Sequence, residues 1–146
     1  MAFEIERKFL VSNSLYKDLA FKCVEIRQGY LNRIPERTVR IRTLDDKGYL
    51  TVKGKNNGAT RLEFEYEIPF EDAEAMLKMC ELPLVEKSRY MVKFQDLVWE
   101  VDEFHGTREG LVVAEVELPE ENFCFNKPPF VGKDVTGEPA YYNSNL

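Results

Sequence analysis

Two carboxylates and an amine occupy alternate positions at the start of this chain. Glu4, Glu6 and Lys8 lie on one face of an expected strand, with Phe3 and Ile5 on the other face. Residues two apart on a strand are neighbours, roughly 6 to 7 Å apart. The two carboxylates therefore repel each other unless a cation lies between them. A surface strand does not need this arrangement, whereas a site for a metal ion and an anion does.

Charged pairs at the same spacing recur on later strands, each opposite an apolar face. The basic pairs are Arg40 with Arg42, Lys53 with Lys55, and Lys87 with Arg89; the acidic sets are Glu63 with Glu65 and Glu67, Glu100 with Asp102, and Glu115 with Glu117. For any single strand, a solvated sheet face is the simplest explanation. Like charges destabilise a sheet when they are adjacent, so the whole series instead favours a closed sheet. The charges would line its interior, and helices and the tail would cover its apolar outer faces.

Such an interior suits a polyanion together with a hard metal ion. Guanidinium groups fork onto phosphate oxygens, and ammonium groups act as point charges. Clustered carboxylates favour Mg²⁺ or Mn²⁺, which prefer oxygen ligands. A metal that bridges carboxylates and phosphate oxygens would neutralise charge as a P–O bond breaks.

The elements that must position these residues are mostly strands. Strands are expected at residues 2–11, 23–33, 37–45, 48–55, 60–69, 84–94, 96–104 and 111–118, with helices at 14–19 and 70–79. Turn residues such as Asn56-Asn57-Gly58 and Gln95-Asp96 separate them. The tail, 128–146, reads as irregular, with room for one short helix. The sequence predicts an α+β, mainly β fold.

Length and composition set broad limits on function. The 146 residues suit one domain, 1–146, and a net charge of −6 argues against a general grip on DNA or an acidic membrane. Without an apolar signal or spanning segment, a cytoplasmic protein is expected. The three separated cysteines indicate neither disulfides nor a zinc knuckle. The single histidine, His105, argues against Ser-His-Asp catalysis and multi-histidine metal sites.

The ordered series of charged pairs resembles the CYTH domain, whose members are also called triphosphate tunnel metalloenzymes. The resemblance rests on Glu4-x-Glu6-x-Lys8, Arg40-x-Arg42, Lys53, Arg61-x-Glu63-x-Glu65, Lys87-x-Arg89, Asp102 and Glu115-x-Glu117. It covers essentially the whole chain, because Gly132–Gly137 and Tyr142-Asn143 resemble the family's closing segment. A lone Glu-x-Glu-x-Lys would be weak evidence, whereas the full series is specific.

The resemblance implies an eight-stranded antiparallel tunnel with a charged interior and a few flanking helices, binding a triphosphate and one or two divalent metal ions. By position, the metal ligands would come from Glu4, Glu6, Glu63, Glu65, Asp102, Glu115 and Glu117. The phosphate-binding residues would be Lys8, Arg40, Arg42, Lys53, Lys87 and Arg89. Lys55 and Glu67 continue the same faces and would lie at the rim.

Tyr30 is the candidate proton acceptor, acting with Lys8. The segment Gln28-Gly29-Tyr30-Leu31 resembles one in compact bacterial members, in which the tyrosine works with the lysine of the opening motif. A free tyrosine has a pKa near ~10, so a nearby cation such as Lys8 would have to lower that value. A rim tyrosine that only donates or accepts a hydrogen bond remains an alternative. So does attack by a metal-bound water without a protein base.

The leading hypothesis is a metal-dependent hydrolase of inorganic tripolyphosphate or a small triphosphate ester, by water attack on a metal-bound phosphoryl group. Thiamine triphosphate and nucleoside triphosphates are the candidate esters. The alternatives are an adenylyl cyclase that forms cyclic AMP from ATP and a polyphosphate-binding sensor without turnover. The partner is then a small triphosphate, with no DNA or membrane, and the outward apolar faces leave room for a homodimer.

Overall fold

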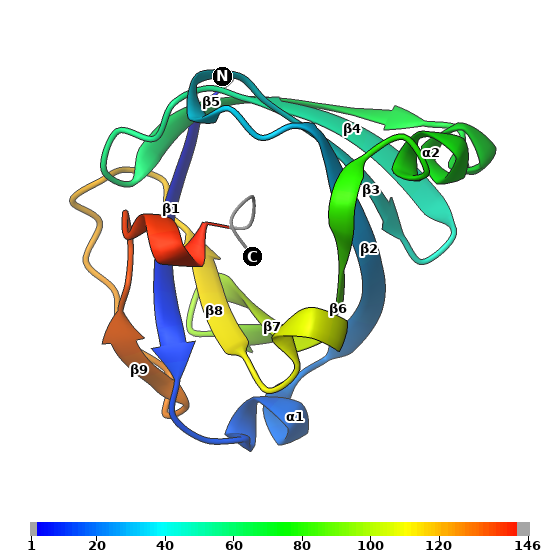
Figure 1. The fold of residues 1–146 in the computed structure, drawn as a ribbon. Helices are drawn as coiled ribbons and strands as arrows, with labels where there is room; N and C mark the ends of the chain where they lie inside the picture. The colour runs from blue at the N-terminus through cyan, green and yellow to red at the C-terminus, as the bar shows by residue number, and fades with distance from the viewer. Residues whose placement is uncertain (1–2, 143–146) are drawn as a thin grey trace.

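The computed structural model describes residues 3–142. Within them the chain forms nine strands, two α-helices and three short 3-10 turns (Figure 1). The strands are β1 (Phe3–Val11), β2 (Lys22–Asn32), β3 (Thr38–Leu44), β4 (Lys47–Lys53), β5 (Thr60–Ile68), β6 (Glu81–Phe94), β7 (Leu97–His105), β8 (Val112–Glu117) and β9 (Val131–Asp134). The helices are α1 (Leu15–Leu19) and α2 (Phe70–Leu77), and the 3-10 turns are Pro35–Arg37, Gly106–Arg108 and Pro139–Tyr141.

The sheet closes on itself through β1. Its antiparallel strands follow the order β5-β4-β3-β2-β6-β7-β8-β1, and β1 then pairs with β5 through Phe3 opposite Leu62 and Glu4 opposite Arg61. Closure removes the open edges that a flat sheet would expose. The predicted eight-stranded antiparallel barrel is therefore confirmed, and Figure 1 looks along its axis.

One strand was not expected from the sequence. β9 pairs with the far part of β1, with Phe9 opposite Asp134 and Val11 opposite Val131, and lies outside the closed ring. The prediction of an irregular tail was wrong for these four residues. β6 also begins at Glu81, three residues before the expected start. Asn143, part of the predicted closing segment, lies outside the described residues.

The apolar faces of β1, β7 and β8 point outward, as predicted. Trp99 and Phe9 are buried there and pack with Phe130 from the tail and Tyr16 from α1. The Phe9 and Trp99 rings lie 5.6 Å apart between centroids. Burying these aromatic side chains is the main stabilising contribution on this side. The largest of the three buried clusters therefore lies between the barrel wall and its covering.

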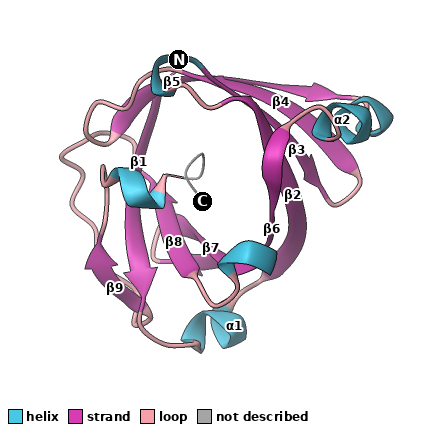
Figure 2. Cartoon of the chain, viewed as in Figure 1, coloured by secondary structure: helices cyan, strands magenta, loops and turns pink. Residues whose placement is uncertain are grey.

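On the opposite side α2 covers β3 and β4 (Figure 2). Ala73 and Leu77 of the helix pack on buried Ile41 of β3. Gly48 allows the close approach, because a Cβ there would lie 2.6 Å from the Cβ of Ala73. The outer face of β5 is more open, and Phe64 and Tyr66 are exposed. None of the helices in the described residues is long and apolar enough to cross a membrane.

Part of the barrel interior is apolar. Val85, Phe104 and Val113 form a buried cluster and share the inward face with the charged residues of β6, β7 and β8. Val24 and Ile26 of β2 lie opposite Arg89 and Lys87 and are also buried. The charged interior predicted from the sequence is thus confined to part of the barrel.

Candidate functional site

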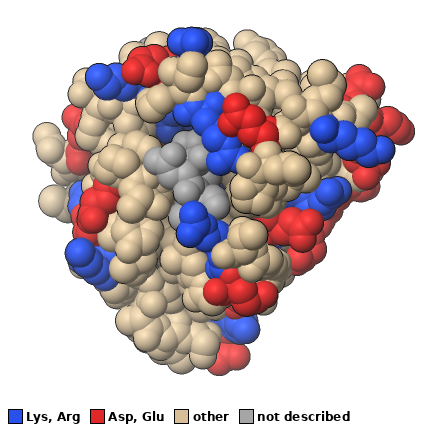
Figure 3. Space-filling model, viewed as in Figure 1, with Lys and Arg blue, Asp and Glu red and all other residues tan. Residues whose placement is uncertain are grey.

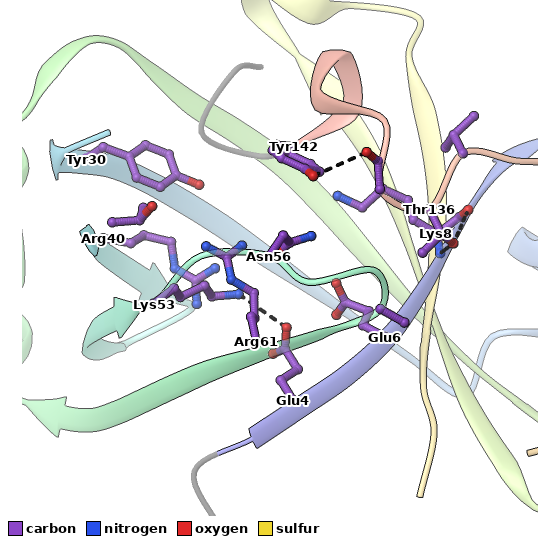
Figure 4. A pocket seen from close by; sticks show the side chains of 14 residues that line it. Glu4, Glu6, Lys8, Tyr30, Arg40, Lys53, Asn56, Arg61, Thr136 and Tyr142 are labelled. Atoms are coloured by element: carbon purple, nitrogen blue, oxygen red, sulfur yellow. Dashed lines mark hydrogen bonds and ion pairs between the residues drawn. The ribbon is translucent and has the colours of Figure 1, made fainter. Parts of the chain in front are cut away.

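A cationic cavity opens at the barrel mouth that carries the tail segment. Its lining includes Lys8, Arg40, Lys53 and Arg61 together with Glu4, Glu6, Tyr30, Thr38, Asn56, Ala59, Val135, Thr136, Gly137 and Tyr142. Four cationic side chains thus face two carboxylates among the described residues that line it. Lys and Arg side chains gather around this mouth (Figure 3). Figure 4 shows the cavity from close by.

An acidic cavity lies beside it in the same interior. Its described lining consists of seven carboxylates, Glu4, Glu6, Glu63, Glu65, Glu100, Glu115 and Glu117, with Arg40, Arg42, Lys53, Arg89 and Phe3. Glu4, Glu6, Arg40 and Lys53 line both cavities, so the two cavities meet inside the barrel. At this junction the Nζ of Lys53 lies 3.5 Å from a Glu4 oxygen and 3.7 Å from a Glu63 oxygen.

Two pairs of carboxyl groups in the acidic cavity each share a hydrogen bond. Burial raises the pKa of Glu6 well above its ordinary value, and the charges of Glu115 and Glu4 add to the effect. Burial also raises the pKa of Glu115, but Lys8 and the hydrogen bond with Glu6 outweigh it and hold that pKa well below its usual range. Glu6 is therefore the protonated partner of the pair.

In the second pair, Glu63 and Glu4, the two pKa values are also shifted in opposite directions. Burial and the hydrogen bond with Glu4 raise the pKa of Glu63 to about 7. Burial raises the pKa of Glu4, but the bond with Glu63 and the charge of Lys53 bring it below the ordinary value. Two carboxyl groups this close cannot both ionise without a cation to compensate them.

These carboxylates fit a hard divalent cation. Within residues 3–142 no three carboxylates converge as a formed metal centre. However, Oε1 of Glu115 is buried without a hydrogen-bond partner in the described residues. A divalent ion could replace the two shared protons and satisfy this oxygen, and an all-oxygen donor set is the one that Mg²⁺ and Mn²⁺ prefer.

The paired arginines of β3 are held in place by a glutamate. Nη2 of Arg40 and Nη2 of Arg42 each donate to Oε2 of Glu65 at 3.3 Å, and Thr51 donates to the same oxygen at 3.0 Å. The Nε groups of both arginines are buried without a partner among the described residues. Donors of this kind are rare in folded proteins unless they serve a ligand. They fit the oxygens of an anion.

The family model of the CYTH domain matches residues 2–142, nearly the whole chain. The chain belongs to the CYTH domain family. Membership of this family of tunnel metalloenzymes implies dependence on a divalent metal ion. The resemblance noted in the sequence is thereby confirmed.

Two relatives in the family are inorganic triphosphatases. The protein from Acetivibrio thermocellus is 54% identical over 147 residues, covering 100% of this chain and 94% of its own length. The protein from Nitrosomonas europaea is 35% identical and covers 98% of this chain and 95% of its own length. A solved crystal structure of an inorganic triphosphatase superposes with a TM-score of 0.70 at 33% identity, covering 97% of this chain and 95% of that chain.

Two predicted site residues of this CYTH domain line neither cavity. Lys87 and Asp102 are each about 1% exposed. Nζ of Lys87 lies 2.7 Å from Oδ2 of Asp102, and the Asp102 carboxylate also accepts two hydrogen bonds from Arg89 at 2.8 and 2.9 Å. Burial lowers the pKa of Lys87 to about 8, although Asp102 opposes this effect. The pKa of Asp102 falls to about 2 because Arg89 and Lys87 outweigh the effect of burial. Asp102 thus holds Arg89 in this structure, and its role as a metal ligand stays a prediction.

Glu65 likewise already has partners in the protein, and its predicted role as a metal ligand stays a prediction. It lines the acidic cavity, but its Oε2 already accepts hydrogen bonds from two arginines and a threonine. Its placement fits a residue that orients Arg40 and Arg42, which the sequence predicts to bind phosphate. The other predicted metal ligands, Glu4, Glu6, Glu63, Glu115 and Glu117, line the acidic cavity together.

Lys8 and Tyr30 both line the cationic cavity. Nζ of Lys8 donates to the Tyr141 carbonyl oxygen at 2.8 Å and lies 3.6 Å from Glu115. Burial lowers the pKa of Lys8, but Glu115 and Glu6 raise it above the ordinary value, so the amine is charged. Burial raises the pKa of Tyr30 above its ordinary value, although Arg40 and Lys8 act in the opposite direction. The condition set for Tyr30 as a base, a pKa lowered by a nearby cation, is thus not met here, and its role as proton acceptor stays a prediction.

Several cavity residues had no role assigned from the sequence. Arg61, Asn56 and Thr38 line the cationic cavity, and Glu100 lines the acidic one. Arg61 and Glu100 could have been found, because each occupies an alternate position beside a predicted site residue. Thr38 also alternates with Arg40 but is uncharged, and Asn56 lies between β4 and β5, so neither belongs to a charged pair.

Proposed function

We propose that this chain is a divalent-metal-dependent hydrolase of inorganic triphosphate. The observation that carries the proposal is the meeting of a cationic and an acidic cavity at shared residues, including Glu4, Arg40 and Lys53. The cations suit the phosphate chain, and the carboxylates suit a metal ion beside it. The names of the two curated relatives support inorganic triphosphate over an ester.

The chain's own residues would do the following. Arg40, Arg42, Lys53 and Arg89 would bind phosphate oxygens, with Glu65 and Asp102 fixing the guanidinium groups. Glu4, Glu6, Glu63, Glu115 and Glu117 would supply the metal ligands. A bound divalent ion would neutralise negative charge on the phosphoryl group. Lys8, which is held charged at the cavity wall, would stabilise charge that develops on a phosphate oxygen.

The test is phosphate release by the purified protein. We expect release from tripolyphosphate with Mg²⁺ or Mn²⁺, loss of release with EDTA, and slower turnover of ATP and thiamine triphosphate. Cyclic AMP as the main product from ATP and Mn²⁺ would support the cyclase alternative instead. Tight tripolyphosphate binding without hydrolysis under either metal would support the sensor alternative and contradict our proposal.

Other parts of the proposal concern the protein as a whole. We propose a single domain over 1–146, Mg²⁺ or Mn²⁺ as the metal with one or two ions bound, and a cytoplasmic location. The exposed outer face of β5, with Phe64 and Tyr66, leaves room for a homodimer. Size-exclusion chromatography with light scattering and metal analysis of the active protein test the oligomeric state and the metal.

A further inference from the structure

Arg61 lines the outer end of the cationic cavity, by which we mean the part that the acidic cavity does not share. It belongs to β5, faces Glu4 across the strand pair that closes the barrel, and lines the cationic cavity but not the acidic one. Arg40 and Lys53, by contrast, line both cavities. Figure 4 shows the Arg61 side chain among those of Asn56, Lys53 and Glu4. Moving outward from the junction of the cavities, a ligand would thus reach Arg40 and Lys53 first and Arg61 next.

The Arg61 guanidinium is fixed by the backbone. Its Nε and Nη2 donate to the Gly54 carbonyl oxygen at 3.1 and 2.8 Å, across the β4–β5 connection. These bonds leave both N–H groups of Nη1 available to a ligand. The partner is a neutral carbonyl, and within residues 3–142 no carboxylate lies within ion-pairing distance of Arg61. A fixed, uncompensated guanidinium in a cavity is well suited to a phosphate group.

Asn56 adds a second polar group from the same connection. It lines the cationic cavity, and its Oδ1 is buried without a hydrogen-bond partner in the part of the chain that the structure describes. The oxygen and nitrogen of an amide exchange places by a flip of the side chain. A flip would direct the two N–H groups of Asn56 to the buried position, where they could donate to an anion.

We propose that Arg61 and Asn56 form a further phosphate subsite, which binds the terminal phosphate of a linear phosphate chain and selects against pyrophosphate. This inference rests on the proposed function, since it places the substrate in the same tunnel. Two phosphates held by Arg40 and Lys53 at the junction would not extend to the outer end of the cavity. A third phosphate would reach it, so Arg61 would affect triphosphate binding more than pyrophosphate binding.

Calorimetric titration of tripolyphosphate and of pyrophosphate, with Ca²⁺ as the metal, tests this proposal. We expect Arg61→Met to weaken tripolyphosphate binding at least about tenfold and pyrophosphate binding less than about twofold. In turnover with Mg²⁺, KM for tripolyphosphate should rise by a similar factor while kcat changes less than about threefold. Lys55→Met is the matched control, because it removes an exposed cation from the same connection and should change neither affinity.

Asn56→Asp provides a test that keeps the Arg61 anchor on Gly54. It is nearly isosteric and adds a negative charge at the proposed subsite, so it should also weaken tripolyphosphate binding selectively, about tenfold. Arg61→Lys should recover part of the affinity lost in Arg61→Met. It restores the positive charge but not the paired N–H donors of the guanidinium group.

Equal weakening of both ligands, or no weakening of either, in both variants would overturn the subsite. A wild-type protein that binds tripolyphosphate with this Arg61 dependence but releases no phosphate would contradict the proposed function and leave the subsite intact. Normal hydrolysis with an unchanged KM in Arg61→Met and Asn56→Asp would support the proposed function and contradict the subsite.

Discussion

The cationic and acidic cavities share a barrel interior, but they hold their charged side chains in different ways. In the part of the cationic cavity that the acidic cavity does not share, Arg61 donates to a backbone carbonyl oxygen, and so does Lys8, which also lies 3.6 Å from Glu115. In the acidic cavity, Arg42 is held by Glu65, and Arg89 by Asp102 and Glu100. A carbonyl fixes a cation without neutralising it, whereas a carboxylate does both. A cation held by a carbonyl keeps its positive charge for an anionic ligand. A cation held by a carboxylate is more strongly fixed, but its charge is compensated.

The largest expected effect is on stability, and it concerns Asp102. Asp102→Asn would leave buried Lys87 without its anionic partner and leave Arg89 with only the 3.3 Å contact to Glu100, and we expect a loss of about 3–5 kcal/mol in the free energy of unfolding. Urea denaturation followed by circular dichroism measures it. Glu86→Gln removes an exposed partner of Arg27 and should cost less than about 1 kcal/mol. A loss below 1 kcal/mol for Asp102→Asn would show that the carboxylate does not hold these cations.

The metal assignment of the acidic cavity is tested at Glu115. Glu115→Gln keeps the shape of the side chain but removes the charge of a buried carboxylate whose Oε1 accepts no hydrogen bond from the described residues. We expect kcat/KM for tripolyphosphate to fall about 100-fold, or about 2.7 kcal/mol, and the apparent affinity for Mg²⁺ to fall with it. Glu67→Gln, on the exposed end of β5, is the matched control. Full activity of Glu115→Gln at ordinary Mg²⁺ concentrations would contradict the assignment.

A smaller effect is expected at Glu65, which we assign to orientation of Arg40 and Arg42. Glu65→Gln keeps a hydrogen-bond acceptor but weakens the hold on both guanidinium groups. KM for tripolyphosphate should rise about tenfold while the Mg²⁺ concentration needed for half-maximal activity stays within about twofold. A large shift in the Mg²⁺ requirement would instead restore the metal-ligand role predicted from the sequence.

The smallest effect concerns the pH dependence of stability through Glu63. Its pKa is raised to about 7 in the folded protein, from an ordinary value of 4.5. Between these values the folded state binds the extra proton, so this contribution to stability is complete below pH 4.5 and is lost as the pH rises to about 7. A divalent ion that replaces the proton should therefore stabilise the protein more as the pH rises through 7.

Melting temperatures with EDTA and with Mg²⁺, measured from pH 5 to 8.5, test this linkage. The gap between the two curves should widen toward high pH in the wild type and widen less in Glu63→Gln. Identical widening in both proteins would assign the proton to another group.

Much of the barrel could be predicted from alternation alone. The series from Glu4 to Glu117 placed the charges on inward faces, because neighbouring strand residues point to opposite sides. The pairing of Arg89 with Asp102 could also have been predicted. A turn at Gln95-Asp96 sets Phe94 opposite Leu97, and counting back along the hairpin brings Arg89 opposite Asp102.

Other features depend on contacts that no local pattern records. β9 has only four residues, including Gly132, and its strand conformation comes from pairing with β1 over 120 residues away in sequence. Likewise, the pKa of Tyr30 depends on how completely the fold buries it, which outweighs the cations that the sequence places nearby. Alternation gives the direction of a side chain, but not the depth at which it lies.

The pairing of β1 has a consequence for how the chain folds during synthesis. β1 precedes the other described strands in the chain and pairs only with β5, β8 and β9 among them, and β9 ends at Asp134. Its contacts are thus among the most distant in sequence, and such contacts form slowly. Until then β1 must remain an unpaired strand. The charges of Glu4, Glu6 and Lys8 would then protect it from pairing with other nascent chains, before they serve any ligand.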